Sequence, residues 1–205
     1  MRIVKKMNFW LLVILLPLMS GCSLQSKVPA TAKYMLDVDT DTTVSKVSGC
    51  QKKVLRMGLI ESSSMLNSSS IYYRTDALRS YEYKRARWMD SVSHQVIDLM
   101  TQSIIKHASF GSVINFKSFA KNDLLLETNF YDFSQTLHED GTSSVRMFVK
   151  LVLLEQYHRN IIDSKFIEIK IDGLEANVEG AMKGYDQLTV AYIKELNAFL
   201  DRNCQ

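Results

Sequence analysis

Residues that could perform catalysis are few and scattered in this sequence. The four histidines, His94, His107, His138 and His158, form no His-x-x-x-His pair. The chain also contains no Cys-x-x-Cys motif, no Gly-x-Ser-x-Gly motif and no glycine-rich phosphate loop. A catalytic centre needs a nucleophile, a base or a metal held in such patterns, so the sequence predicts a protein without enzymatic activity, metal or cofactor.

The densest carboxylates are Asp37, Asp39 and Asp41, which alternate along the chain as the first ligands of a calcium loop do. Such a loop has glycine at its sixth position and a bidentate glutamate at its twelfth. Here the sixth position is not glycine, and Ser48 stands at the twelfth. We therefore expect a solvated polar loop at this place.

Cys22 is the cysteine whose surroundings indicate a reaction. A basic start (residues 1–6), an apolar run (9–19) and the small pair Ser20-Gly21 form the pattern of an export signal. The apolar run is shorter than the roughly 20 residues that span a bilayer. The series 18–22 matches a bacterial lipobox except for Met19, where leucine is usual. We expect cleavage after Gly21 and attachment of fatty acyl chains, palmitate among them, to Cys22; an ordinary signal peptide is the alternative.

Composition after that cut excludes one class of partner. The chain has 25 basic and 22 acidic residues, and the signal segment holds three of the basic ones, so the remaining 184 residues are electrically balanced. A protein that binds nucleic acid through phosphates would show a basic excess. We therefore predict no nucleic-acid partner. The expected organisation is a signal peptide (1–21), a polar tether (22–32) and one domain (33–205).

Cys50 and Cys204 are left as an even pair once Cys22 is acylated. In an oxidising compartment two such thiols often form a disulfide. Two separate thiols are the alternative, because the sequence does not show that the ends of the domain meet.

Hydrophobic periodicity predicts an α+β fold with a mostly antiparallel mixed sheet packed by two main helices, at about 90–107 and 174–201. Asp90 is the expected N-cap of the first helix. Glycines 180 and 184 on the second helix suit a close neighbour. The strands are expected at 34–38, 54–60, 71–74, 80–83, 113–116, 124–137, 145–154 and 164–171, the last three as a meander turned by Asp140-Gly141.

Aromatic and arginine side chains are concentrated between residues 71 and 88. Tyrosine, tryptophan and arginine are enriched where proteins bind one another. We therefore predict a partner-binding surface here, although each residue could instead pack in the core or on the sheet. The candidate residues are Tyr72, Tyr73, Arg74, Tyr81, Arg87 and Trp88.

This segment resembles the ABC-type transport auxiliary lipoproteins, which include the lipoprotein components of Pqi- and Mla-type systems. The matching motifs are Tyr34-Met35-Leu36, Ile71-Tyr72-Tyr73-Arg74, Tyr81 and Arg87-Trp88. The proline that many members carry after the Arg-Trp pair is absent, since Met89 follows. The resemblance implies a non-enzymatic lipoprotein that faces the periplasm from the outer membrane, and Ser23 after the acylated cysteine agrees with that sorting. The implied partners are a mammalian-cell-entry (MCE) domain protein and an ATP-driven (ABC) permease, with phospholipid as cargo; a homo-oligomer is also allowed.

Two other functions stay open at this point. An outer-membrane biogenesis or adhesion lipoprotein would have the same anchor and a different partner. An envelope hydrolase would need His94, His138 or His158 beside a carboxylate and a hydroxyl.

Overall fold

The computed structural model describes residues 29–40, 49–75 and 79–204. The chain divides into two compact units, 1–30 and 31–205, and the second contains every element named below. The predicted signal peptide, Cys22 and most of the predicted tether lie outside the described residues.

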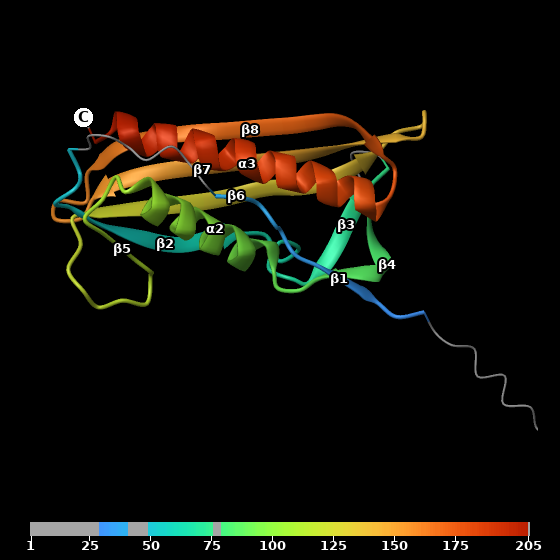
Figure 1. The fold of residues 1–205 in the computed structure, drawn as a ribbon, viewed down its shortest axis with the longest axis horizontal. Helices are drawn as coiled ribbons and strands as arrows, with labels where there is room; N and C mark the ends of the chain where they lie inside the picture. Colours follow the sequence, from blue (N-terminus) through green and yellow to red (C-terminus); the bar gives the residue numbers. More distant parts are fainter. Residues whose placement is uncertain (1–28, 41–48, 76–78, 205) are drawn as a thin grey trace, which may run out of the picture. The chain divides into compact units, whose positions relative to one another are not determined.

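Unit 31–205 is built on one mixed sheet with two helices on one of its faces, so the α+β prediction is confirmed (Figure 1). Strand β6 is central, because its first half pairs with β2, its end pairs with β3, and its other side pairs with β7 along nearly its full length. The strands are β1 (Ala32–Tyr34), β2 (Val54–Ser62), β3 (Ser70–Arg74), β4 (Ser80–Trp88), β5 (Ser112–Ile114), β6 (Leu124–Leu137), β7 (Thr142–Glu155) and β8 (Ile161–Glu175). The helices are α2 (Val92–His107) and α3 (Val178–Arg202).

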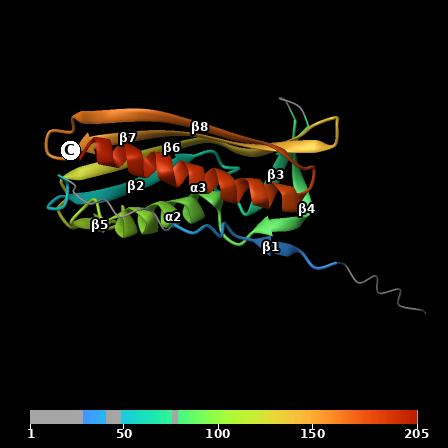
Figure 2. The ribbon, with the colours of Figure 1, turned by 45° about the horizontal axis from the view of Figure 1, so that its top comes forward.

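The meander β6–β7–β8 confirms the predicted one, and its two ladders are the longest antiparallel pairings of the sheet. The hairpin turns at Gly141, whose φ of 82° suits a residue without a Cβ. Alternate residues of β7 from Val145 to Leu153 are fully buried under the helices, and Arg146 and Lys150 lie on the opposite face. That opposite face is called the open face below. Helix α3 packs on β7 and β8, and α2 packs on β2, β5 and α3 (Figure 2).

Helix α3 begins at Val178, four residues later than predicted. Leu174 still belongs to β8, where it pairs with Ser143 of β7. The side chain of Asn177 then caps the helix by accepting a hydrogen bond from the backbone N–H of Gly180 at 2.7 Å. Apolar periodicity does not distinguish the end of a strand from a helix that follows it directly. The prediction from periodicity therefore assigned the last residues of β8 to the helix.

The N-cap of the first helix also lies one residue later than predicted. Ser91, not Asp90, is the N-cap, because the Ser91 hydroxyl accepts from the backbone N–H of His94. The predicted first strand at 34–38 is wrong as well. β1 covers Ala32–Tyr34 and runs parallel to the end of β4, which extends five residues beyond its predicted end at Tyr83.

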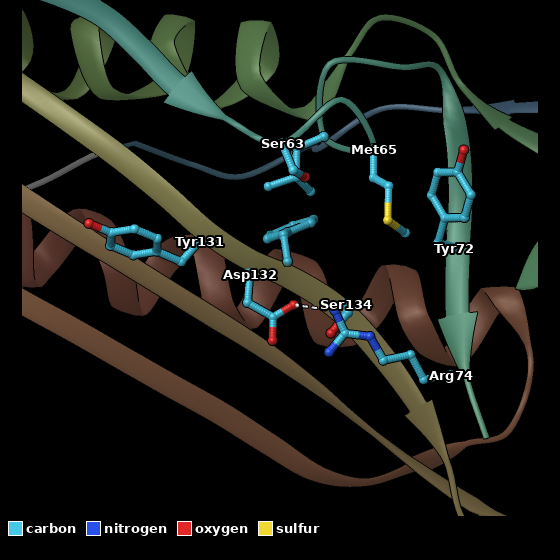
Figure 3. A pocket seen from close by; sticks show the side chains of 9 residues that line it. Ser63, Met65, Tyr72, Arg74, Tyr131, Asp132 and Ser134 are labelled. Carbon is cyan, nitrogen blue, oxygen red and sulfur yellow. Dashed lines mark hydrogen bonds and ion pairs between the residues drawn. The ribbon is translucent and has the colours of Figure 1, made fainter. Parts of the chain in front are cut away.

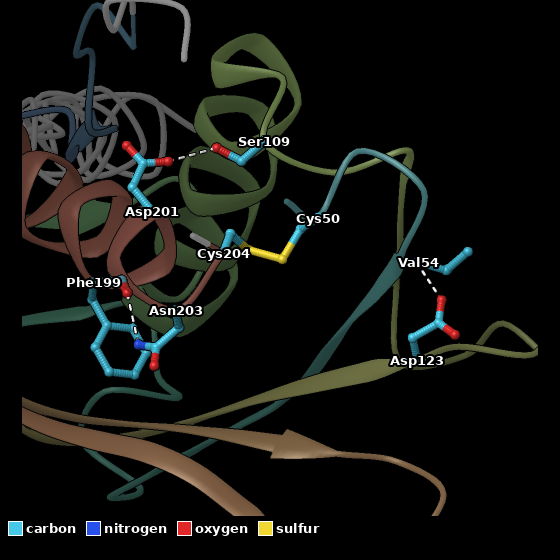
Figure 4. The surroundings of a disulfide bond; sticks show 8 residues. All are labelled: Cys50, Val54, Ser109, Asp123, Phe199, Asp201, Asn203 and Cys204. Carbon is cyan, nitrogen blue, oxygen red and sulfur yellow. Dashed lines mark hydrogen bonds between the residues drawn. A yellow bond between two sulfur atoms is a disulfide. The ribbon is translucent and has the colours of Figure 1, made fainter. Parts of the chain in front are cut away.

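Cys50 and Cys204 form a disulfide, so of the two alternatives the structure has the bridge (Figure 4). Their Cα atoms lie 5.1 Å apart across a sequence separation of 154 residues. The backbone N–H of Gly49 also donates to the carbonyl of Cys204. The start of β2 is thereby joined to the end of α3.

Candidate protein interface at the β3–β4 hairpin

Three tyrosines gather on the side of the β3–β4 hairpin nearer the start of α3. Tyr73 and Tyr81 are directly cross-strand partners, and their stacked rings lie 5.6 Å apart between centroids. Tyr83 adds a third ring, 4.7 Å from that of Tyr73. Tyr81 is the outermost, with 39% of its surface exposed. The hairpin therefore presents an aromatic cluster with one accessible face.

Tyr83 joins this cluster to the rest of the sheet. Its hydroxyl donates to Oε1 of Gln135 at 2.8 Å, and Gln135 is fully buried in β6. Burial, together with the nearby Tyr73 and Glu179, raises the pKa of Tyr83 to about 12. This tyrosine is therefore neutral and acts as a structural support for the exposed pair.

The structure assigns Arg87 and Trp88 to other roles than the one predicted. The Arg87 guanidinium is held on its own hairpin by Glu82 at 2.6 Å and by the carbonyl of Tyr83. Trp88 is only 3% exposed and packs against Phe133 and Tyr185, with ring centroids 6.3 and 5.7 Å away. The prediction that Trp88 lies on a binding surface is wrong, because β4 continues through residue 88 and turns alternate side chains into the core.

Tyr72 and Arg74 lie on the other side of β3 and line a small pocket with Asp132 (Figure 3). Nη2 of Arg74 lies 3.4 Å from Oδ1 of Asp132. The free volume of the pocket is about 30 Å³. That is room for one or two water molecules, whereas small-molecule pockets typically have about 300 Å³ or more. An acyl chain does not fit here, so these residues support the hairpin and do not enclose a ligand.

Sequence reasoning missed the group that organises the open face. Asp132, 7% exposed, also receives a hydrogen bond from Nη1 of Arg146 at 2.9 Å, and Nε of Arg146 donates to Glu168. The Glu168 hydrogen bond is the main cause that raises the pKa of Arg146. The rings of Tyr131, Phe148 and Phe166 continue along this face at centroid distances of 5.3 and 5.8 Å. The alternation of Arg146, Phe148 and Lys150 along β7 was the sequence signal that could have indicated this charged and aromatic surface on the open face.

The histidines do not form a catalytic arrangement among the described residues. His94 contacts Asp90, His158 contacts Glu155, and His138 contacts the hydroxyl of Ser144. None of these three rings contacts both a carboxylate and a hydroxyl there. At the fourth histidine, His107, the ring and the Ser109 hydroxyl both contact the Asp201 carboxylate, whereas in a catalytic triad the histidine lies between the carboxylate and the hydroxyl.

Among the described residues no three His, Cys, Asp or Glu side chains gather in a way that could hold a metal ion, and Asp41 of the calcium-like series lies outside these residues. Neither α2 nor α3 is both long and apolar enough to cross a bilayer.

Comparisons with known proteins relate the chain by fold. No family model and no curated protein matches the sequence. Protein XCC0632 from Xanthomonas campestris, described with family model DUF330, has a similar structure with a TM-score of 0.75 and 12% sequence identity, over 84% of this chain and 96% of that one. A second crystal structure, described only as an uncharacterized protein, has a TM-score of 0.63 and 10% identity, over 84% of this chain and 99% of its own. At these identities the likeness shows a shared fold.

Proposed function

We propose that this chain is a non-enzymatic lipoprotein of the bacterial envelope that docks a protein partner of a lipid-transport system. The lipobox at Cys22 supports the anchor, and the family resemblance supports an outer-membrane location with an MCE-domain protein and an ABC permease as partners. The structural likeness to XCC0632 supports the fold of the domain alone.

The observation that carries the docking proposal is exposed Tyr81 on a free strand edge, stacked on partly buried Tyr73. Among the described residues, β4 pairs only with β3 and, at residues 86–88, with β1. The stretch from Ser80 to Arg85 is therefore an open edge within the described residues. A partner strand could pair with that edge while its side chains cover Tyr81 and Tyr73.

Co-purification of the acylated chain with the MCE-domain protein and permease tests this function. Tyr81→Ser removes the exposed ring and should weaken capture about tenfold, a loss typical of an interface hot spot. Tyr157→Ser is the matched control, since Tyr157 is an exposed tyrosine in the β7–β8 turn. Equal capture by Tyr81→Ser and wild type would place the docking surface elsewhere.

Two further measurements separate the alternatives. Mass spectrometry of the mature amino terminus should show a diacylglyceryl-modified Cys22, and an unmodified terminus would contradict the anchor. Capture of a protein unrelated to lipid transport, with no ATPase or permease gene beside this one, would favour the biogenesis or adhesion alternative.

A further inference from the structure

The loop between β5 and β6 (residues 115–123) carries the most exposed aromatic side chain of the described residues. Phe119 is fully exposed, and Phe116 in the same loop is 41% exposed. Single exposed hydrophobic residues are common on proteins. The bonds and charges around Phe119 distinguish this loop from such cases.

Arg56 of β2 holds the loop in one conformation. Its guanidinium donates to the carbonyls of Ser118 at 2.7 Å and Ala120 at 2.6 Å, and to the side-chain oxygen of Asn122 at 2.9 Å. Phe119 lies between the two bonded carbonyls. The aromatic ring is thus displayed by a fixed loop, which loses little conformational entropy on binding.

Three backbone N–H groups of the loop have hydrogen-bond partners within it. The N–H groups of Lys117 and Ser118 donate to the side chain and the carbonyl of Asn115, and the N–H of Ala120 donates to the Ser118 hydroxyl. Such bonds also occur in ordinary surface turns. In the hydrocarbon region of a bilayer, where water is absent, they leave fewer backbone groups without a partner.

Cations flank the ring. Lys117 and Lys121 lie two residues before and after Phe119. Lys53 lines the same surface hollow as Lys121, and the carboxylates of Asp123 and Glu155 line that hollow too. Within the described residues none of these three lysines has a carboxylate at ion-pair distance. The nearest acid in sequence, Asp123, accepts the backbone N–H of Val54. The ammonium of Lys117 lies 5.5 Å from the centroid of the Phe116 ring. An apolar tip flanked by Lys117 and Lys121 is complementary to an anionic lipid surface.

The loop and the chain's entry into unit 31–205 lie at opposite ends of α3. At the start of that helix, the Tyr34 hydroxyl of β1 donates a hydrogen bond to Glu179. At its end, Asp201 accepts a hydrogen bond from Ser109, which lies just before β5 and the loop. Twenty-five helical residues at about 1.5 Å each separate the two ends by about 37 Å. In Figure 1, β1 and the yellow-green loop both lie on the side of the sheet away from β8.

We propose that Phe119, assisted by Phe116, inserts into the anionic bilayer to which the chain is anchored, so that the domain is held at both ends and lies along the membrane. The ten residues from Cys22 to Ala32 reach up to about 35 Å when extended, which permits this arrangement. The insertion goes beyond the proposed function. The part of it that depends on acylation of Cys22 is the statement that the anchor and Phe119 enter the same bilayer.

Fluorescence quenching by brominated lipid tests the insertion. The acylated chain carrying Phe119→Trp is reconstituted into vesicles of phosphatidylglycerol or phosphatidylcholine with bromine on the acyl chains. We expect quenching of about twofold in phosphatidylglycerol and weaker quenching in phosphatidylcholine. The matched probe Tyr81→Trp should not be quenched. Equal fluorescence of Phe119→Trp in brominated and plain vesicles would overturn the proposal.

A variant with fewer charges tests whether the Phe119 loop contacts lipid or protein. Lys117→Gln with Lys121→Gln should lower the quenching of Phe119→Trp in phosphatidylglycerol and leave it unchanged in phosphatidylcholine. If Phe119→Ala weakens capture of the MCE-domain protein while Phe119→Trp stays unquenched, the loop contacts protein and the lipid proposal is wrong. If the proposed acylation is wrong, mass spectrometry shows an unmodified Cys22, and this result is independent of the quenching experiment.

Discussion

Asp132 is the residue on which the open face depends. Its carboxylate is nearly buried and is shared by Arg74 of β3 and Arg146 of β7. A carboxylate taken from water needs such partners, because an unpaired buried charge is strongly destabilising. This residue therefore links the hairpin that carries the tyrosine pair to the meander.

Replacing Asp132 should cost more stability than replacing an exposed acid of the same network. Asp132→Asn removes the charge that both arginines contact and should lower the free energy of unfolding by about 1–3 kcal/mol. Glu168→Gln, at the exposed end of the network, should change it by less than about 1 kcal/mol. Urea unfolding measures both. Similar losses for the two variants would mean that burial of Asp132 does not matter.

Asp163 should contribute a pH-dependent part of the stability. Its carboxylate accepts hydrogen bonds from Asn203 and Arg202, and these lower the pKa of Asp163, Asn203 being the larger cause. A lowered folded-state pKa gives stability that is present at neutral pH and disappears as pH falls through that pKa. Asp163→Asn should therefore be less stable than wild type by about 0.5 kcal/mol at pH 7.

That difference should shrink below about pH 4, where the carboxyl group becomes protonated. Thermal unfolding across this range is the measurement. Asp98→Asn is the control, since among the described residues no group donates a hydrogen bond to the exposed Asp98 side chain. A difference that stays constant from pH 7 to pH 2 would contradict the assignment.

At the scale of elements, α3 approaches the sheet closely because of its glycines. A Cβ on Gly184 would lie against Cδ1 of Leu174 in β8 and only 2.6 Å from Cγ2 of Val145 in β7. A Cβ on Gly180 would meet the carbonyl oxygen of Glu175. The predicted close neighbour of these two glycines is therefore the sheet and its turn into the helix.

Gly184→Ala tests that contact. Alanine has the better helix propensity by about 1 kcal/mol, so an exposed site would gain stability. Here the clash should outweigh that gain and lower the free energy of unfolding by about 1–2 kcal/mol, a typical cost of overpacking. Gln187→Ala, exposed on the same helix, should be neutral or slightly stabilising. Chemical denaturation compares the two, and a more stable Gly184→Ala protein would refute the close packing.

Several elements were predictable because one physical signal dominated each. Alternation along β7 and the Asp140-Gly141 turn were enough to indicate the meander, and the apolar period was enough for most of α3. The ends of β4 and α3 were not predictable in this way. Trp88 was misplaced because its burial depends on β1 pairing beyond Tyr83, and that pairing joins segments more than 50 residues apart.

The candidate site was predictable only in composition. Residues 71–88 showed tyrosines and arginines in two short strands, and the Tyr73–Tyr81 pair follows from the hairpin. The contact of Arg74 with Asp132 joins residues 58 apart in sequence, and neither residue type indicates the other. The exposed Phe119 loop was not predicted either. Its conformation depends on hydrogen bonds from Arg56, which lies in β2 and is distant in sequence.

At the scale of the whole unit, the disulfide is the constraint with the longest reach. Cys50 and Cys204 close a loop of more than 150 residues, which on the chain-entropy model stabilises the fold by about 5 kcal/mol, with measured bridges nearer 2–5 kcal/mol. The Cys50→Ser, Cys204→Ser double variant should lose stability in that range, as read from its unfolding midpoint in denaturant. An unchanged midpoint would show that the ends of the unit are held equally well by other contacts.

The attachment of the β3–β4 hairpin has a mechanical consequence. Its backbone ladder to β6 consists of two residue pairs, Tyr73 with Gln135 and Arg74 with Thr136, whereas β7 is bonded along both of its sides. Amide hydrogens of residues 80–85 should accordingly exchange with solvent much faster than those of β7. A partner bound to the tyrosine pair would then move the outer end of the hairpin, while Trp88 and the Tyr83–Gln135 hydrogen bond keep the rest of it packed on the sheet. Recognition at this end can therefore adapt in angle without disturbing the core.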